Sequence, residues 1–151
     1  NQVFITVLFP AISRLADKRD GIRLVTNMES RLYPLLFLGS LGGIAALLKI
    51  FGPSYPFRLT FVFLFALYGT MFIASSIRFW MIAAIGRKGA TYVAIHGLIA
   101  SVLIVIGNFS LLPRIGIAGA AVAGIAAFIY TFITARLFFL RYDEQPEHFD
   151  E

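Results

Sequence analysis

The sequence predicts an all-α membrane protein with four full transmembrane helices and the end of a preceding one. Residues 32–140 contain no Asp or Glu, and all eight acidic residues lie outside that stretch. The chain is 59% hydrophobic and only 14% charged, whereas a soluble domain has roughly 25% charged residues. The apolar runs are also long enough for membrane crossing, because a bilayer core of ~30 Å needs roughly 20 apolar residues as helix.

The chain opens with an apolar run, residues 3–12, that is too short to cross a bilayer alone. It lacks the positively charged start of a signal peptide. We therefore interpret residues 1–13 as the end of a truncated transmembrane helix and expect the chain to be a fragment of a longer protein. Residues 14–31 are charged, and the pattern fits either a short amphipathic helix on the cytoplasmic membrane surface or a solvated loop.

The four transmembrane helices are expected at about 32–50, 59–85, 91–112 and 117–140. Pro34 falls in the first turn of the first span, where its missing N–H costs nothing. Gly39 and Gly43 have the GxxxG spacing that lets membrane helices approach closely, so we interpret them as packing residues.

Clusters of Gly, Pro and basic residues separate the spans, and they predict turns at 51–56, 86–89 and 113–116. The last span opens with a run of Gly and Ala, so close approach of its backbone to a neighbour is expected there. Residues 141–151 form an acidic tail that we expect to be cytoplasmic and disordered.

The basic residues predict the orientation in the membrane. Nine lie in segments on one side of the predicted spans: Arg14, Lys18, Arg19, Arg23, Arg31, Arg87, Lys88, Arg136 and Arg141. Three lie on the other side: Lys49, Arg58 and Arg114. Because cytoplasmic loops of membrane proteins carry the excess of Lys and Arg, residues 14–31, the 86–89 turn and the C-terminus are predicted to face the cytoplasm.

Arg78 and His96 are the candidate substrate-binding residues. Arg78 is the only basic residue well inside a span, where a charge is costly and marks a functional site unless the side chain reaches the lipid phosphates. His96 lies about one turn into the third span, and it can bond across helices or contact a polar substrate. For Asn108 we expect an interhelical hydrogen bond, and for Ser75 and Ser76 bonds to their own helix.

The residues argue against several classes of function. Cysteine is absent, so no disulfide or thiolate site exists. The spans offer no paired carboxylates, no metal-ligand cluster and no nucleophile beside a base, so we expect no enzyme, no metal and no cofactor. The basic residues are scattered rather than gathered on one face, which argues against nucleic acid as a partner.

Several motifs occur in a family-like order: Val7-Leu-Phe-Pro-Ala-Ile-Ser-Arg-Leu15, Phe51-Gly-Pro-Ser-Tyr55, Gly86-Arg-Lys88 and Leu112-Pro-Arg-Ile-Gly116, with a run of Gly and Ala after the last. In this order the chain resembles the C-terminal part of polysaccharide biosynthesis proteins, the Wzx-type lipid-linked oligosaccharide flippases. These belong to the multidrug/oligosaccharidyl-lipid/polysaccharide exporter superfamily. The resemblance covers all but the acidic tail, although Arg78 matches none of its motifs.

The resemblance implies a two-lobe bundle of about twelve or more helices around a cationic cavity. It implies a transporter of the bacterial inner membrane that moves undecaprenyl-pyrophosphate-linked oligosaccharide from the cytoplasmic to the outer leaflet by alternating access. Its partners would be the lipid bilayer, the missing N-terminal helices, and a glycan polymerase and glycosyltransferases. Two alternatives stay open: a cation-coupled multidrug exporter of the same superfamily, which would carry a membrane acid that these spans lack, and a non-transporting scaffold subunit.

Overall fold

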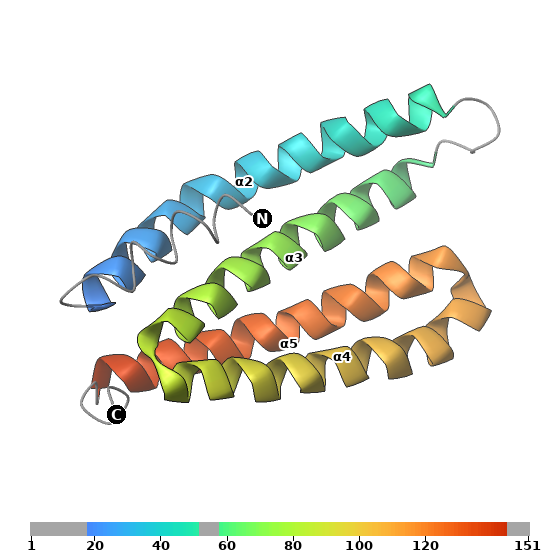
Figure 1. Cartoon of the computed structure of the whole chain (residues 1–151). Coiled ribbons are helices and arrows are strands. Elements are labelled where there is room, and N and C mark those ends of the chain that lie inside the picture. The colour runs from blue at the N-terminus through green and yellow to red at the C-terminus, as the bar shows by residue number, and fades with distance from the viewer. Residues whose placement is uncertain (1–17, 52–57, 145–151) are drawn as a thin grey trace.

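The computed structural model describes residues 18–51 and 58–144, and these residues form four helices (Figure 1). The helices are α2 (Lys18–Ile50), α3 (Leu59–Ile85), α4 (Arg87–Ile115) and α5 (Ile117–Glu144). All four contain segments long and apolar enough to cross a membrane, so the predicted all-α membrane class is confirmed to this extent. The truncated helix predicted at 1–13 and most of the predicted tail lie outside the described residues.

α2 begins earlier than the sequence predicts. It starts at Lys18 and continues without a break, so neither a separate surface helix nor a loop is observed over residues 18–31. Its membrane-spanning part is Arg31–Ile50, close to the predicted span. At ~1.5 Å per residue the 33-residue helix is ~50 Å long, which exceeds a bilayer core of ~30 Å. The charged half therefore has room outside the membrane, and Pro34 lies inside the helix rather than in its first turn.

Single glycines join α3 to α4 and α4 to α5. Gly86 has φ 146° and ψ −164°, and Gly116 has φ 63° and ψ −150°. The predicted four-residue turns are therefore shorter, because Arg87 already opens α4 and Pro113 still lies inside it. Such backbone angles are almost confined to glycine, so one glycine replaces a longer turn. Apart from these joints, the second and fourth spans match their predicted limits closely, with α5 continuing to Glu144.

Replacing Gly86 by Ala is expected to lower the thermal stability of the protein. A Cβ at these backbone angles costs ~1–3 kcal/mol. The two long helices that flank Gly86 keep the backbone from moving to angles that would relieve this strain. The matched control is Gly97→Ala inside α4, where the nearest neighbour of an added Cβ is the Cε2 atom of Phe79 at 3.8 Å. The measurement is the temperature at which the detergent-solubilised protein loses its monodisperse elution peak. Equal losses in the two variants would contradict the strained joint.

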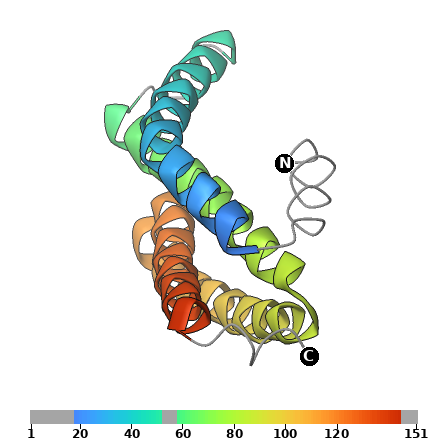
Figure 2. The same cartoon turned by 90° about the vertical axis from the view of Figure 1, so that its left-hand side faces the viewer.

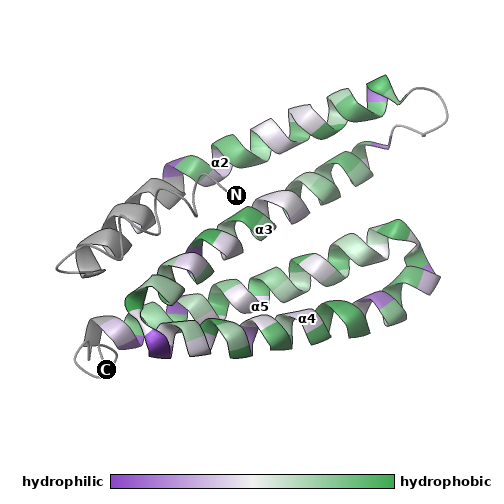
Figure 3. Cartoon of the chain, in the orientation of Figure 1, coloured by the Kyte–Doolittle hydropathy of each residue, from purple (hydrophilic) through white to green (hydrophobic). Residues whose placement is uncertain are grey.

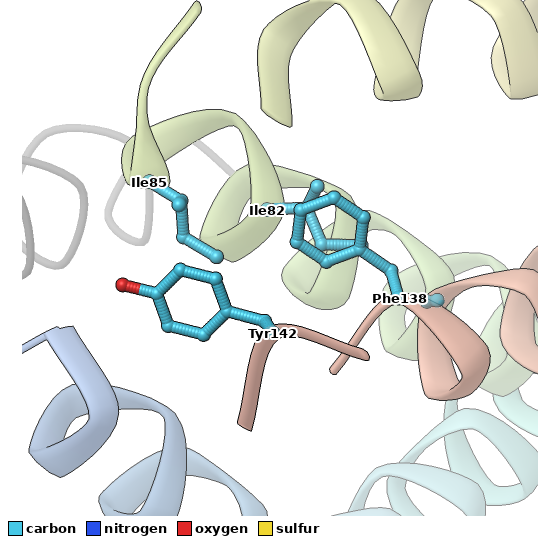
Figure 4. Close-up of a cluster of buried hydrophobic side chains, with 5 residues drawn as sticks. Ile82, Ile85, Phe138 and Tyr142 are labelled. Carbon is cyan, nitrogen blue, oxygen red and sulfur yellow. The ribbon is translucent and has the colours of Figure 1, made fainter. Parts of the chain in front are cut away.

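The helices run alternately up and down, and α3 lies between α2 and the α4–α5 pair (Figures 1 and 2). α3 packs against all three other helices, and α4 packs against α5. Near the Gly86 end, five buried residues join α3 to α5: Ile82, Ile85, Ala135, Phe138 and Tyr142 (Figure 4). A second cluster around Met81 also contacts Leu32 of α2 and Phe139 of α5. The three helices α2, α3 and α5 therefore meet at this end.

Glycines bring the helices of the α3–α4–α5 group close together. A Cβ at Gly107 would lie 2.6 Å from the Cβ of Ala123, and one at Gly124 would overlap the ring of Tyr68. A Cβ at Gly119 would lie 2.6 Å from the backbone carbonyl of Leu111. The predicted close approach at the start of the last span is thus observed.

The GxxxG pair of α2 behaves differently from these glycines. No side-chain or neighbouring-helix atom lies within 4 Å of a Cβ built at Gly39 or Gly43. Both residues are exposed, so within the described residues the expected packing is not formed. Hydrophobic residues run along α3, α4, α5 and the coloured part of α2 (Figure 3), and many on α2 and α4 are exposed, including Leu35, Leu98 and Phe109.

Candidate functional site

Arg78 lies inside the apolar part of the bundle, on α3. The distance along the helix from Arg78 to Ile85 is ~10 Å at ~1.5 Å per residue. The side chain is half-buried, and its Cζ atom lies 3.6 Å from the centre of the Phe132 ring on α5. A cation over an aromatic face contributes ~0.5–2 kcal/mol. Phe132 therefore holds the guanidinium against α5, inside the apolar part of the bundle that is long enough to cross a membrane.

The neighbours of Arg78 along the chain place it on the side of the bundle where α2 packs. Met81 of α3 packs in the cluster that includes Leu32 of α2 and Phe139 of α5. Phe139 lies on the same face of α5 as Phe132, because residues seven apart are two helical turns apart. Arg78 is thus held where α2, α3 and α5 meet, one turn farther from the Gly86 end than Met81.

His96 lies on α4 and bonds across the helix interface, as one of its two predicted roles requires. Its Nδ1 atom is 2.7 Å from the hydroxyl oxygen of Tyr130 on α5. The imidazole also stacks against Tyr92, with ring centres 4.1 Å apart and planes inclined by 37°. The side chain is half-buried, so it remains partly open at the surface of the described bundle.

Three polar residues near His96 were not singled out from the sequence: Tyr92, Tyr130 and Thr134. Tyr92 donates a hydrogen bond from its hydroxyl to the carbonyl oxygen of Thr134, at 2.9 Å. The signal that could have found them is spacing. Tyr92 and His96 are four residues apart on one helix, Tyr130 and Thr134 on another, and such pairs share a helix face. Facing pairs of this kind form one interhelical polar cluster.

The structure does not bring Arg78 and His96 together. Arg78 contacts Phe132 and His96 contacts Tyr130, and these two residues of α5 are separated by Thr131 alone. At ~100° per residue they point about 160° apart around the helix axis. Arg78 therefore lies on the α2 side of α5 and His96 on the α4 side. A substrate that binds both residues must contact α5 from two directions; otherwise the two residues have separate roles.

The two serines form the predicted bonds to their own helix. The hydroxyl groups of Ser75 and Ser76 donate to the carbonyl oxygens of Met71 and Phe72, each at 2.8 Å. The Ser75 hydroxyl also lies 3.4 Å from the carbonyl oxygen of Phe128 on α5, a contact between helices that the sequence did not predict.

Asn108 does not make its predicted interhelical bond within the part of the chain that the structure describes. Its Oδ1 atom is buried and has no hydrogen-bond partner there. Among the same residues, no group of three or more His, Cys, Asp or Glu side chains is placed to hold a metal ion.

By the length and composition of its helices, the chain is of the class of multi-pass helical membrane proteins, with one arginine held in its apolar part. Comparisons of the chain with protein-family models, with curated proteins and with solved structures find no match. Any function more specific than this class therefore depends on the motifs and on the geometry of Arg78 and His96.

Proposed function

We propose that the chain is part of a flippase that moves undecaprenyl-pyrophosphate-linked oligosaccharide from the cytoplasmic to the outer leaflet of a bacterial inner membrane. Three features support the proposal: the ordered motifs that resemble the Wzx-type family, the four apolar helices, and the absence of acidic residues from residues 32–140. In this proposal the helices belong to the second lobe of a two-lobe bundle, follow the end of another helix, and work by alternating access.

The observation that carries the proposal is the position of Arg78. A guanidinium matches the geometry of phosphate oxygens and remains charged at all physiological pH values. Phe132 fixes this group in the apolar part of the bundle, where a phosphate contact is stronger than in water because the local dielectric constant is lower. Residues 32–140 contain no Asp or Glu, so the spans carry no negative side chain that would repel an anionic substrate.

The distribution of charge supports loading from the cytoplasmic side. Arg87 and Lys88 open α4 at the Gly86 end, and Arg136 and Arg141 lie on the last part of α5. The helices alternate in direction, so these residues gather at the end of the bundle nearer Arg78 (Figure 1). By the positive-inside rule this end faces the cytoplasm, which is the side where the proposed substrate is made.

The proposal predicts that the complete gene product containing this chain moves a lipid-linked sugar between leaflets. The probe is undecaprenyl-pyrophosphoryl-N-acetylglucosamine in liposomes, and an impermeant galactosyltransferase outside reports the sugar in the outer leaflet. With the protein present, the fraction of sugar that reacts should rise with time from about half toward completion, because pyrophosphate headgroups cross a bare bilayer extremely slowly. Liposomes without protein are the control.

The same assay separates the alternative functions. A rate equal to that of protein-free liposomes would remove the flippase proposal. Protein-dependent uptake of a lipophilic drug cation, without movement of the sugar lipid, would indicate the multidrug exporter. Movement of neither probe would favour the scaffold subunit.

A further inference from the structure

His96 is the one side chain within residues 32–140 that ordinarily changes charge near neutral pH. The stretch contains no Asp, Glu or Cys, and the only other histidine of the chain is His148 in the tail. Imidazole is the side chain whose ordinary charge change falls between pH 5 and 8. Arg and Lys side chains ordinarily change charge only well above this range. A proton that binds within these spans at physiological pH therefore has a single candidate site.

The surroundings of His96 suit both of its charge states. Tyr130 offers a hydroxyl that can donate to neutral Nδ1 or accept from a protonated one, at 2.7 Å. The Tyr92 ring lies against the imidazole, with centres 4.1 Å apart, and an aromatic face stabilises a neighbouring cation. Nε2 has no hydrogen-bond partner among the described residues, so the ring is not locked in one state by a second bond.

Few charged groups face His96. On its own helix Tyr92 lies beside it, and Tyr92 in turn interacts electrostatically with Arg141 of α5. From α5 the facing group is Tyr130. From α3 the Phe79 ring lies 3.8 Å from the Cβ position of Gly97, the residue after His96. Arg78 contacts Phe132 on another face of α5. No carboxylate lies in these spans to hold the imidazole permanently charged.

We propose that His96 and Tyr130 form a proton-binding pair at the α4–α5 interface. When the ring is neutral with its proton on Nε2, the Tyr130 O–H group donates to Nδ1. When Nδ1 takes up a proton supplied by water, the imidazolium donates to the Tyr130 oxygen, and the tyrosine proton turns to another acceptor. The direction of the bond that links α4 to α5 is thereby reversed.

If the chain is the proposed transporter, proton binding at this pair is the step through which a pH gradient across the membrane can affect transport. The link to transport rests on the proposed function, whereas proton binding itself does not. Because Gly107 and Gly119 let α4 and α5 pack closely, a change in their shared hydrogen bond alters contacts along this pair of helices. The predicted cytoplasmic orientation places His96 in the half of the membrane nearer the cytoplasm.

The direct test is a titration of His96 by NMR in lipid nanodiscs. The protein carries His148→Gln and ¹⁵N-labelled histidine, so His96 is the only labelled histidine of this chain. We expect its ring-nitrogen signals to follow a single protonation between about pH 5 and 8. Tyr130→Phe should lower the midpoint by about 0.5–1 unit, because both charge states lose the Tyr130 bond and the bond from the charged ring is the stronger of the two.

Ser101→Ala is the matched control for this titration. Ser101 is exposed on the same helix and donates only to the carbonyl oxygen of Gly97, so its removal should leave the midpoint unchanged. A signal that does not change between pH 4 and 9, or an identical midpoint in Tyr130→Phe, would overturn the proton-binding pair.

The link to transport is tested by a ratio of rates in the liposome assay, with and without an imposed pH gradient. The gradient should accelerate sugar-lipid movement by wild-type protein, and the ratio should fall to about one in His96→Gln, since glutamine bonds but cannot be protonated. An unchanged ratio in His96→Gln would overturn the coupling while leaving the flippase proposal intact. Absence of movement by wild-type protein would overturn the flippase and the coupling together, and the titration alone would then decide whether the pair binds protons.

Discussion

Arg78→Ala is expected to lower the rate of lipid-linked sugar movement by about 10–100-fold. A hydrogen bond to a charged group contributes ~1.5–3 kcal/mol, and each ~1.4 kcal/mol corresponds to a factor of ten. The effect falls on the step in which the pyrophosphate enters the apolar part of the bundle, because that is where Phe132 holds the guanidinium. The measurement is the rate of galactosyltransferase-accessible sugar in proteoliposomes containing equal amounts of folded protein.

Two further variants make the Arg78 result specific. Arg136→Ala removes one exposed positive charge from α5 near the same end of the bundle, and it should change the rate less than twofold if the position of the charge matters. Arg78→Lys keeps the charge but loses the planar group that lies over the Phe132 ring, so an intermediate rate is expected. Equal losses in the two alanine variants would indicate a general surface charge effect, and undiminished movement in Arg78→Ala would remove Arg78 from the substrate path.

Gly119→Ala is expected to destabilise the protein by ~1–3 kcal/mol, as insertion of a methyl group into a packed interface does. A Cβ at Gly119 would lie 2.6 Å from the carbonyl carbon and oxygen of Leu111. These are backbone atoms of α4, so no side-chain rotation can make room for the methyl group. The first turn of α5 would have to move away from α4. The measurement is the midpoint of thermal unfolding in detergent, followed by loss of the monodisperse peak.

Gly43→Ala is the control for this variant. Gly43 lies within the apolar segment Arg31–Ile50 of α2, and nothing lies within 4 Å of the added Cβ. Because Ala favours a helix over Gly by ~1 kcal/mol, the stability of this variant should stay the same or rise slightly. A loss as large as that of Gly119→Ala would mean that another helix covers this face of α2, and stable Gly119→Ala protein would contradict the close α4–α5 approach.

The limits of the helices were predictable where the sequence carries strong local signals. The span at 59–85 matches α3 at both ends, because a Pro-rich segment precedes it and Gly86 follows it. The start of α4 was predicted too late, since the basic residues after Gly86 suggested a turn, while the glycine alone reverses the chain. The start of α2 was missed for a related reason: charged residues suggested a loop, yet a helix can extend beyond the bilayer and keep them in water.

The candidate residues show the same division. The depth of Arg78 and His96 follows from counting residues along a helix, and the sequence therefore located both within the predicted spans. Their neighbours do not follow from counting. Nothing local indicates that Phe132 covers Arg78 or that Tyr130 bonds His96, since these contacts join residues far apart in the chain.

Local composition is enough to predict four long apolar spans, with no Asp or Glu between residues 32 and 140, and to predict how deep Arg78 and His96 lie along them. Those properties depend on local composition and on the constant rise of a helix. Which helix faces meet depends on how the four helices pack against one another. The rotation of each helix about its axis is set by packing, here by the close contacts of Gly107 and Gly119. That packing turns Arg78 and His96 toward opposite faces of α5 and so gives them separate surroundings.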